Sequence, residues 1–240
     1  MIKYQELVKV TMPPEKKTSA SKCIVGHYFV RPISNVITIP LLDMGVSAVT
    51  VTKISCFFSI IAMLFFLTPI NLLGFWGGWI CIFIWNILDG IDGNIARFTS
   101  TCSKEGELWD ATVGWIALVS FYVGMGFVTF YNLDSEIFHL PVSDFLYIFM
   151  GCISALSWIF PRLVMQKKSV LMGEETVSMV KQRSDYGIIK LLLFNLSSIN
   201  GLASVLFLAA YIFNILTVCM ICYCVLSIIV AIGSLYSLLQ

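Results

Sequence analysis

Six long stretches of the chain consist mostly of apolar residues, and this feature restricts the possible folds more than any other. A helix that crosses the hydrocarbon core of a bilayer needs about 20 such residues. The sequence therefore predicts an all-α integral membrane protein built as a bundle of six transmembrane helices. The predicted spans are Val49–Leu67, Leu72–Ile95, Trp109–Phe130, Phe145–Val164, Leu191–Phe213 and Ile215–Leu238.

Composition excludes several other classes of protein. The 240 residues are 58% hydrophobic and 12% charged, whereas soluble domains are about 45–50% apolar and about 25% charged. Fifteen basic residues are offset by fourteen acidic ones, which argues against a nucleic-acid partner. Most of the cysteines lie inside apolar runs, where cysteine acts as a small buried hydrophobe rather than as part of a disulfide framework.

The distribution of Lys and Arg predicts the orientation in the membrane. With a cytoplasmic N-terminus, the connections near 98–106 and 165–190 and the C-terminus are cytoplasmic too, and every Lys and Arg lies on that side. The external loop 131–144 contains no basic residue. This is the asymmetry that the positive-inside rule describes, so we expect both termini in the cytoplasm.

The first 48 residues form a segment of a different kind. Lysines precede a stretch of mixed polarity, His27–Leu42, which contains Arg31, Pro32 and Pro40. We expect an amphipathic helix that lies in the cytoplasmic interface, with its basic groups toward anionic headgroups. The predicted division is thus an interfacial segment, 1–48, and a six-helix catalytic domain, 49–240.

Three carboxylates are predicted to gather at the cytoplasmic end of the second span. Asp89 and Asp92 are three residues apart, so they share one helix face, and Asp110 lies near the start of the next, antiparallel span. Ionised groups at membrane depth cost several kcal/mol and by default indicate a functional site. A divalent ion such as Mg²⁺, which takes oxygen ligands and binds substrate phosphates, would relieve their mutual repulsion.

A purely structural ion-pair network is the alternative for this cluster. Arg97 and Lys104 are close enough in sequence to pair with the acids at a wet helix end. The interleaved Gly93 and Gly106 favour a site instead, because glycine weakens a helix and permits close approach of a ligand to the backbone.

The segment resembles the signature of the CDP-alcohol phosphotransferases, D-x2-D-G-x2-A-R-x8-G-x3-D-x3-D. Ser47–Thr52 is also similar to the family's T-P-N-x-V-T, in a loose form. Seven of the eight fixed positions match, at Asp89, Asp92, Gly93, Ala96, Arg97, Gly106 and Asp110.

The resemblance implies an activity and a set of ligands. A substituted phosphate would pass from a CDP-linked alcohol to a second alcohol, with release of CMP, in a bilayer-embedded homodimer. Two ions, Mg²⁺ or Mn²⁺, would bind the pyrophosphate, with Asp89 and Asp110 each contacting both ions and Asp92 contacting one. The residues that would line the CDP-alcohol site are Thr52, Gly93, Arg97 and Ser103.

The chain departs from the family pattern at Gly114, where the motif has a fourth aspartate that is held to act as general base. An altered active enzyme, an inactive CDP-alcohol-binding member and a scaffold subunit are three interpretations. Retention of three costly carboxylates favours the first. Glu107 is a candidate substitute base because Glu107, Asp110 and Gly114 follow i, i+3, i+7 spacing. The favoured alternative is that Glu107 is only an interfacial residue near Lys104.

Two other classes of membrane protein also carry acidic residues. Membrane prenyltransferases carry two Asp-rich motifs, whereas this chain has one acidic cluster. A transporter would also place acids at membrane depth.

Arg162, at the cytoplasmic end of the fourth span, is a candidate for binding an anionic acceptor. The alternative is that Arg162 serves as a membrane anchor.

Overall fold

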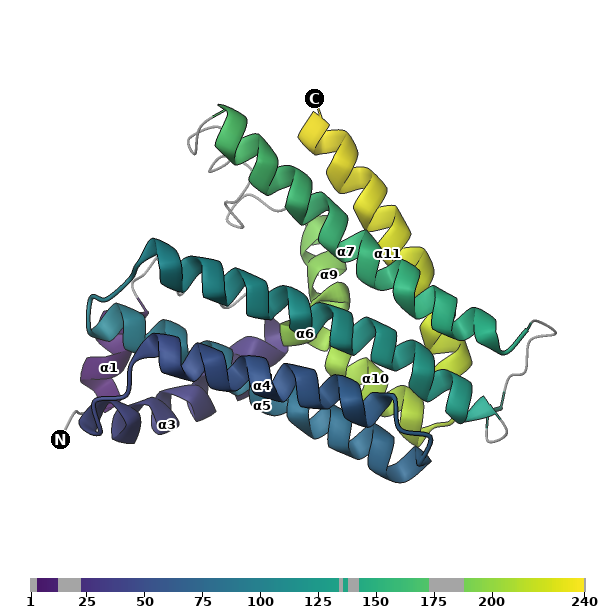
Figure 1. Cartoon of the computed structure of the whole chain (residues 1–240), viewed down its shortest axis with the longest axis horizontal. Coiled ribbons are helices and arrows are strands. Elements are labelled where there is room, and N and C mark those ends of the chain that lie inside the picture. Colours follow the sequence, from purple (N-terminus) through teal and green to yellow (C-terminus); the bar gives the residue numbers. More distant parts are fainter. Residues whose placement is uncertain (1–3, 13–22, 134–135, 138–142, 173–187, 240) are drawn as a thin grey trace.

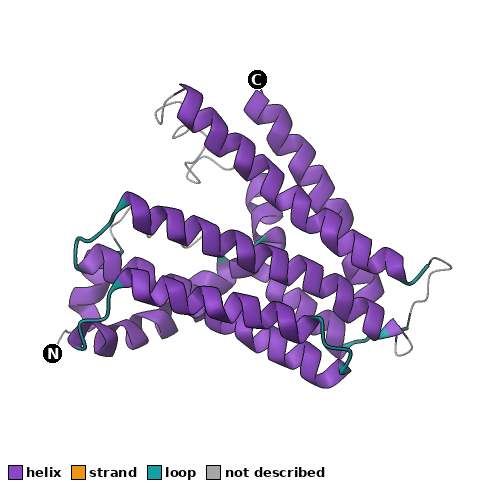
Figure 2. Cartoon of the chain, viewed as in Figure 1, coloured by secondary structure: helices purple, strands orange, loops and turns teal. Residues whose placement is uncertain are grey.

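The computed structural model describes residues 4–12, 23–133, 136–137, 143–172 and 188–239. Every regular element in these ranges is a helix and none is a strand (Figure 2). Parts of the predicted external loop and most of the 165–190 connection lie outside the described residues. The elements are α1 (Tyr4–Thr11), η1 (Gly26–Val30), α3 (Arg31–Asp43), α4 (Ala48–Phe66), α5 (Asn71–Phe98), α6 (Lys104–Tyr131), α7 (Phe145–Met172), α9 (Ile188–Ser197), η4 (Ile199–Ala203), α10 (Ser204–Ile212) and α11 (Leu216–Leu239).

Five of the described helices, α4, α5, α6, α7 and α11, are long and apolar enough to cross a membrane. They coincide with five of the six predicted spans and identify the chain as an integral membrane protein. Two of them begin at a serine cap: the Ser47 hydroxyl accepts a hydrogen bond from the Thr50 backbone N–H, and the Ser103 hydroxyl accepts one from Gly106. Such caps satisfy N–H groups that have no partner within the helix.

The remaining predicted span, Leu191–Phe213, is not confirmed as a continuous helix. The backbone of Ser198 is extended and that of Gly201 is non-helical, so the segment is divided into α9, the π-helical turn η4, and α10. Tyrosine hydroxyls from two other helices donate hydrogen bonds to backbone carbonyl oxygens beside the break. Tyr122 donates to Ser197 O at 2.7 Å, and Tyr223 donates to Leu196 O at 2.8 Å. These bonds make a break tolerable in an apolar setting, where unpaired backbone groups are costly.

The long helices form two groups (Figure 1). Helices α4, α5 and α6 run side by side along the long axis of the molecule, with extensive contacts of α4 to both neighbours. Helices α7 and α11 pack against each other, and α6 joins the two groups through α7. The short helix α9 stands between the groups, while α1 and α3 lie beside the end of α5 at which α5 connects to α6.

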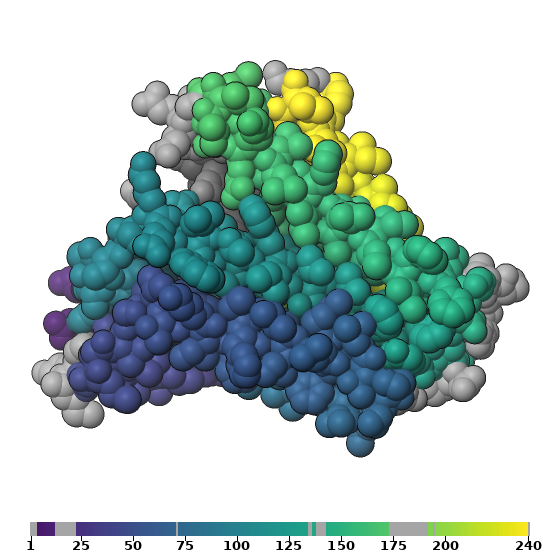
Figure 3. Space-filling view, in the orientation of Figure 1, coloured from purple at the N-terminus to yellow at the C-terminus, as the bar shows by residue number. Residues whose placement is uncertain are grey.

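Many large apolar side chains on the long helices are exposed. Figure 3 shows α4, α6, α7 and α11 together on one face of the molecule. Phe57 on α4 is 61% exposed, Leu156 on α7 is 65% exposed and Ile232 on α11 is 63% exposed. An apolar surface this extensive marks a contact face rather than a surface that faces water.

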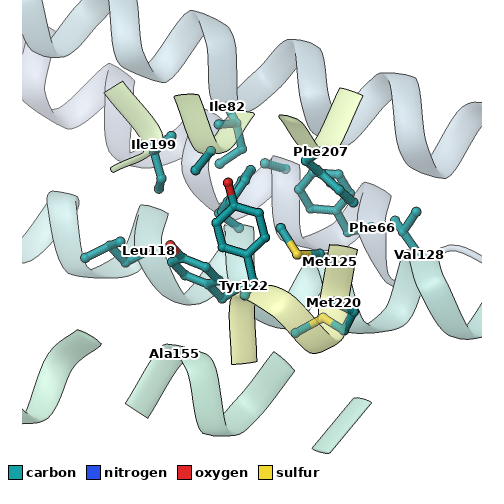
Figure 4. Close-up of a cluster of buried hydrophobic side chains, with 14 of the residues drawn as sticks. Phe66, Ile82, Leu118, Tyr122, Met125, Val128, Ala155, Ile199, Phe207 and Met220 are labelled. Carbon is teal, nitrogen blue, oxygen red and sulfur yellow. The ribbon is translucent and has the colours of Figure 1, made fainter. Parts of the chain in front are cut away.

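The core lies where α4, α5, α6, α10 and α11 meet, and aromatic rings fill much of it (Figure 4). Phe207 makes edge contacts with Phe66 and with Phe121, at ring-centroid distances of 6.0 Å and 5.5 Å, a favoured geometry for aromatic pairs. Close helix approach depends on glycine: a Cβ on Gly126 would meet the Tyr147 carbonyl oxygen at 2.6 Å, which is how α6 and α7 pack tightly.

Helix α3 packs with its polar face inward. Ser34, Asn35 and Thr38 are buried against α5, while Ile33 and Val36 are exposed. The structure therefore has a helix where the sequence predicts an amphipathic one. Ile33 and Val36 face outward, whereas Leu41 and Leu42 near its end pack against Val51, Ile91 and Ile95. Its position in the membrane interface, with basic groups toward headgroups, stays a prediction.

Candidate active site

A cavity of about 630 Å³ lies among η1, α3, α5, α6, α7 and the break between α9 and η4. Most of the predicted site residues line it, and they come from three long helices that are separate in sequence. Those residues are Asp89, Asp92, Gly93, Arg97, Asp110, Gly114 and Arg162.

Helix α5 contributes the largest share of the lining. Its motif residues are spaced three and four apart, which places them along one side of the helix. Asp92 is 6% exposed, and its Oδ2 accepts a hydrogen bond from the Thr52 hydroxyl of α4 at 2.7 Å. The structure thus places Thr52 behind Asp92, where it orients the carboxylate from outside the cavity lining.

Asp89 has a partner that the sequence analysis missed. The side-chain amide of Asn200, at the helix break, hydrogen-bonds to Asp89. Asn200 also lines the cavity, and its Oδ1 is buried without a hydrogen-bond partner. The available signal was weak: Asn195 and Asn200 are the two amide side chains in the mostly apolar run Leu191–Phe213.

Arg97 is held by a chain of buried amides. Its Nη2 donates to Asn94 Oδ1 at 3.0 Å, and Asn94 Nδ2 donates to Asn35 Oδ1 on α3 at 2.9 Å. A Cβ on Gly93 would lie 2.9 Å from Arg97 Nη1, so the motif glycine leaves room for the guanidinium group. Gly93 therefore serves the placement of Arg97, and its predicted role in ligand access stays a prediction.

Helix α6 brings Asp110 and Gly114 to the cavity wall, one turn apart. A Cβ on Gly114 would have no neighbouring atom within 4 Å, so the fourth motif position faces open space. Glu107 and Ser103 are exposed and are not among the cavity-lining residues. Ser103 caps α6, and Glu107 lies in its first turn, where an acidic side chain interacts favourably with the helix dipole.

The three carboxylates are close enough to influence one another. Asp92 and Asp110 both act electrostatically on Asp89, and Arg97 is the cation that opposes them. Carboxylate oxygens are the ligands that Mg²⁺ prefers, so the donor chemistry fits a divalent ion. Within the described ranges, however, no three His, Cys, Asp or Glu side chains are gathered tightly enough to ligate one ion as they stand.

Arg162 approaches the cavity from α7. Its guanidinium carbon lies 5.7 Å from the centre of the Trp158 ring, and its Nη1 donates to the Trp158 carbonyl oxygen at 3.3 Å. Trp158 and Arg162 both line the cavity. The cavity wall thus carries a cation on α7 in addition to Arg97 on α5.

The CDP-alcohol phosphatidyltransferase family model matches residues 46–228. The chain belongs to this family. Membership in the CDP-alcohol phosphatidyltransferases implies transfer of a phosphate from a CDP-alcohol to an acceptor. The family match contains α5, α6 and α7, and it begins after η1 and α3. A comparison with curated proteins finds no match.

Proposed function

We propose that the protein transfers a substituted phosphate from a CDP-linked alcohol to an alcohol acceptor and releases CMP. The observation that carries this proposal is the shared cavity, which Asp89, Asp92 and Asp110 line from two helices, together with Arg97. Phosphoryl transfer depends on positioning and on neutralising charge. The cavity combines both signs of charge with enough volume for a nucleotide-sized ligand.

In this proposal Asp89, Asp92 and Asp110 hold divalent ions, Mg²⁺ or Mn²⁺, which neutralise the charge of the pyrophosphate when bound. The protein's own groups prepare the site. Thr52 orients Asp92, Asn200 orients Asp89, and Arg97 is aimed by Asn94 toward phosphate oxygens. Arg162 is proposed to bind an anionic group on the acceptor, because guanidinium groups match phosphate and carboxylate geometry.

Further parts of the proposal follow from family resemblance and from the charge distribution. The enzyme works as a homodimer in a lipid bilayer, in phospholipid or related phosphodiester synthesis. Its cavity opens toward the cytoplasm, since the motif residues share their end of the predicted spans with the Lys and Arg residues.

The test is release of labelled CMP from a series of CDP-alcohols by the purified chain, with Mg²⁺ or Mn²⁺. We expect Asp89→Asn and Asp110→Asn each to abolish release, because each removes an anionic ligand from closely spaced cations. Lys9→Gln on α1, an exposed position outside the cavity lining, is the control and should keep wild-type turnover. Full turnover by either aspartate variant at saturating metal would contradict the two-metal site.

Gly114 favours a second candidate function, binding of a CDP-alcohol without turnover. The carboxylate held to accept the acceptor's proton is missing there, and the structure has open space in its place. A chain that binds CDP-alcohol with metal, yet releases no CMP with any acceptor, would support this second function over the first.

A further inference from the structure

Arg31, the first residue of α3, lines the same cavity as Arg97. Among the charges that act on Arg97, that of Arg31 has the largest effect. Arg31 Nη1 donates a hydrogen bond to Met12 Sδ at 2.7 Å. Two guanidinium groups that border one cavity repel each other, and an anion between them would relieve that repulsion. The pair thus favours an anionic ligand, and arginine binds phosphate oxygens through strong, often two-pronged, hydrogen bonds.

One hydrogen-bond donor of the Arg97 side chain has no acceptor. Its Nη2 is used by Asn94, but its Nε is buried and has no partner. A buried donor without an acceptor carries a desolvation penalty, which a ligand oxygen would remove. The charge pair and the unpaired Nε are independent observations, and both indicate an anion beside Arg97.

The packing of α3 fixes where Arg31 lies. Arg31 and Asn35 are one helical turn apart and share a face, and Asn35 is bonded to Asn94 of α5. The Ser34 hydroxyl donates to Val30 O at 2.8 Å and approaches Ile87 O of α5 at 3.0 Å. Gly90 has no side chain to obstruct this approach, since a Cβ there would lie 2.5 Å from Ser34 Oγ.

We propose that Arg31 and Arg97 together bind phosphate oxygens of the CDP-alcohol donor, so that α3 completes the donor site. The inference rests on the proposed function and extends it to a residue outside the family match, which begins at residue 46. A phosphate group on the acceptor could be bound by the same two arginines. We assign the Arg31–Arg97 pair to the donor because Arg97 belongs to the donor motif, while Arg162, the candidate for the acceptor, lies on α7 in the other helix group.

The test is direct binding by the full-length chain in detergent, with Mg²⁺ and without acceptor, using CDP, CMP and cytidine as probes. We expect Arg31→Gln to weaken CDP binding about tenfold, the typical loss of a hydrogen bond to a charged group. Cytidine, which has no phosphate, should bind both forms equally. Arg31→Lys should restore part of the CDP affinity, because Lys keeps the charge but not the two-pronged geometry.

Lys9→Gln on α1 is the matched control, since it removes a basic charge from the same N-terminal part of the chain at an exposed position. Equal CDP affinity in the wild type and Arg31→Gln would overturn the inference and leave the proposed function standing. Equal loss for cytidine and CDP would also overturn it, because that pattern indicates a distorted pocket. An unchanged CDP affinity with a raised KM for a phosphorylated acceptor would assign Arg31 to the acceptor instead. A wild-type chain that binds none of the three probes would overturn the proposed function itself.

Discussion

Gly114 is the residue at which this chain departs from the motif of its family, and the structure leaves room beside it. We expect Gly114→Asp to fold with an unchanged melting temperature and to release CMP faster than the wild type. A carboxylate at this position would accept the proton of the acceptor hydroxyl and add a ligand for metal. The measurement is CMP release with the same donor and acceptor pair, at several metal concentrations.

Glu107→Gln is the companion variant for this experiment. Glu107 is exposed in the first turn of α6 and does not line the cavity, so we expect Glu107→Gln to keep full activity. A large loss of turnover, with unchanged CDP affinity, would instead identify Glu107 as the base that replaces the missing aspartate.

Asn200, at the helix break, can be tested for its hydrogen bond to Asp89. Asn200→Leu keeps a side chain of similar size but removes the hydrogen bond to Asp89. We expect about a tenfold fall in kcat/KM, in line with loss of a hydrogen bond to a charged group, and a higher Mg²⁺ concentration for half-maximal activity. If the metal dependence is unchanged and only the melting temperature falls, Asn200 acts on the fold and not on Asp89.

Among individual residues, those of the motif could be predicted from the sequence, but the residues that contact them from other segments could not. The spacing of Asp89, Asp92 and Asp110 is visible in the sequence, and the structure brings these residues to one cavity. Asn200 and Arg31 reach that cavity from segments far away along the chain. No local pattern in the sequence records such long-range packing.

At the scale of elements, hydropathy predicted the helices that cross as single pieces. It placed α4, α5, α6, α7 and α11 to within a few residues at most ends, because each is a long apolar run. It could not predict the division of the fifth run, Leu191–Phe213, since hydropathy measures transfer of side chains and not backbone conformation. The bonds from Tyr122 and Tyr223 that sustain the break come from other helices.

Gly201 provides a test of this break. A Cβ on Gly201 would collide with the backbone carbonyl oxygen of Asn195, which a side-chain movement cannot relieve. We expect Gly201→Ala to lower the free energy of unfolding by about 1–3 kcal/mol, the usual cost of overpacking. The measurement is thermal unfolding in detergent.

Gly233→Ala is the matched control within α11. A Cβ there would meet no atom within 4 Å, so alanine should be neutral or should stabilise the helix by up to about 1 kcal/mol. Equal melting temperatures for the Gly201 and Gly233 variants would show that the break does not depend on a residue without a side chain.

For the whole molecule, the predicted orientation can be checked at the connection between α5 and α6. Thr101 is exposed there, beside the exposed Cys102. On a Cys102→Ser background, we expect Thr101→Cys to react with a membrane-impermeant thiol reagent only after the reagent is admitted to the cytoplasm. The Cys102→Ser chain alone reports any labelling of other cysteines, such as the exposed Cys222 of α11. Labelling of Thr101→Cys from outside intact cells would show that this connection lies on the external side and would contradict the predicted orientation.

The polar face of α3, which packs against α5, determines how much of the N-terminal segment a shortened chain must keep. A chain shortened to the family match, from residue 46, would lose Asn35 and with it the partner of Asn94. It would also lose Gly26, Arg31 and Ser34, which form one wall of the cavity. Such a chain would retain every residue of the motif and yet have this cavity open on one side. The smallest piece that is useful for enzymology therefore begins before Gly26.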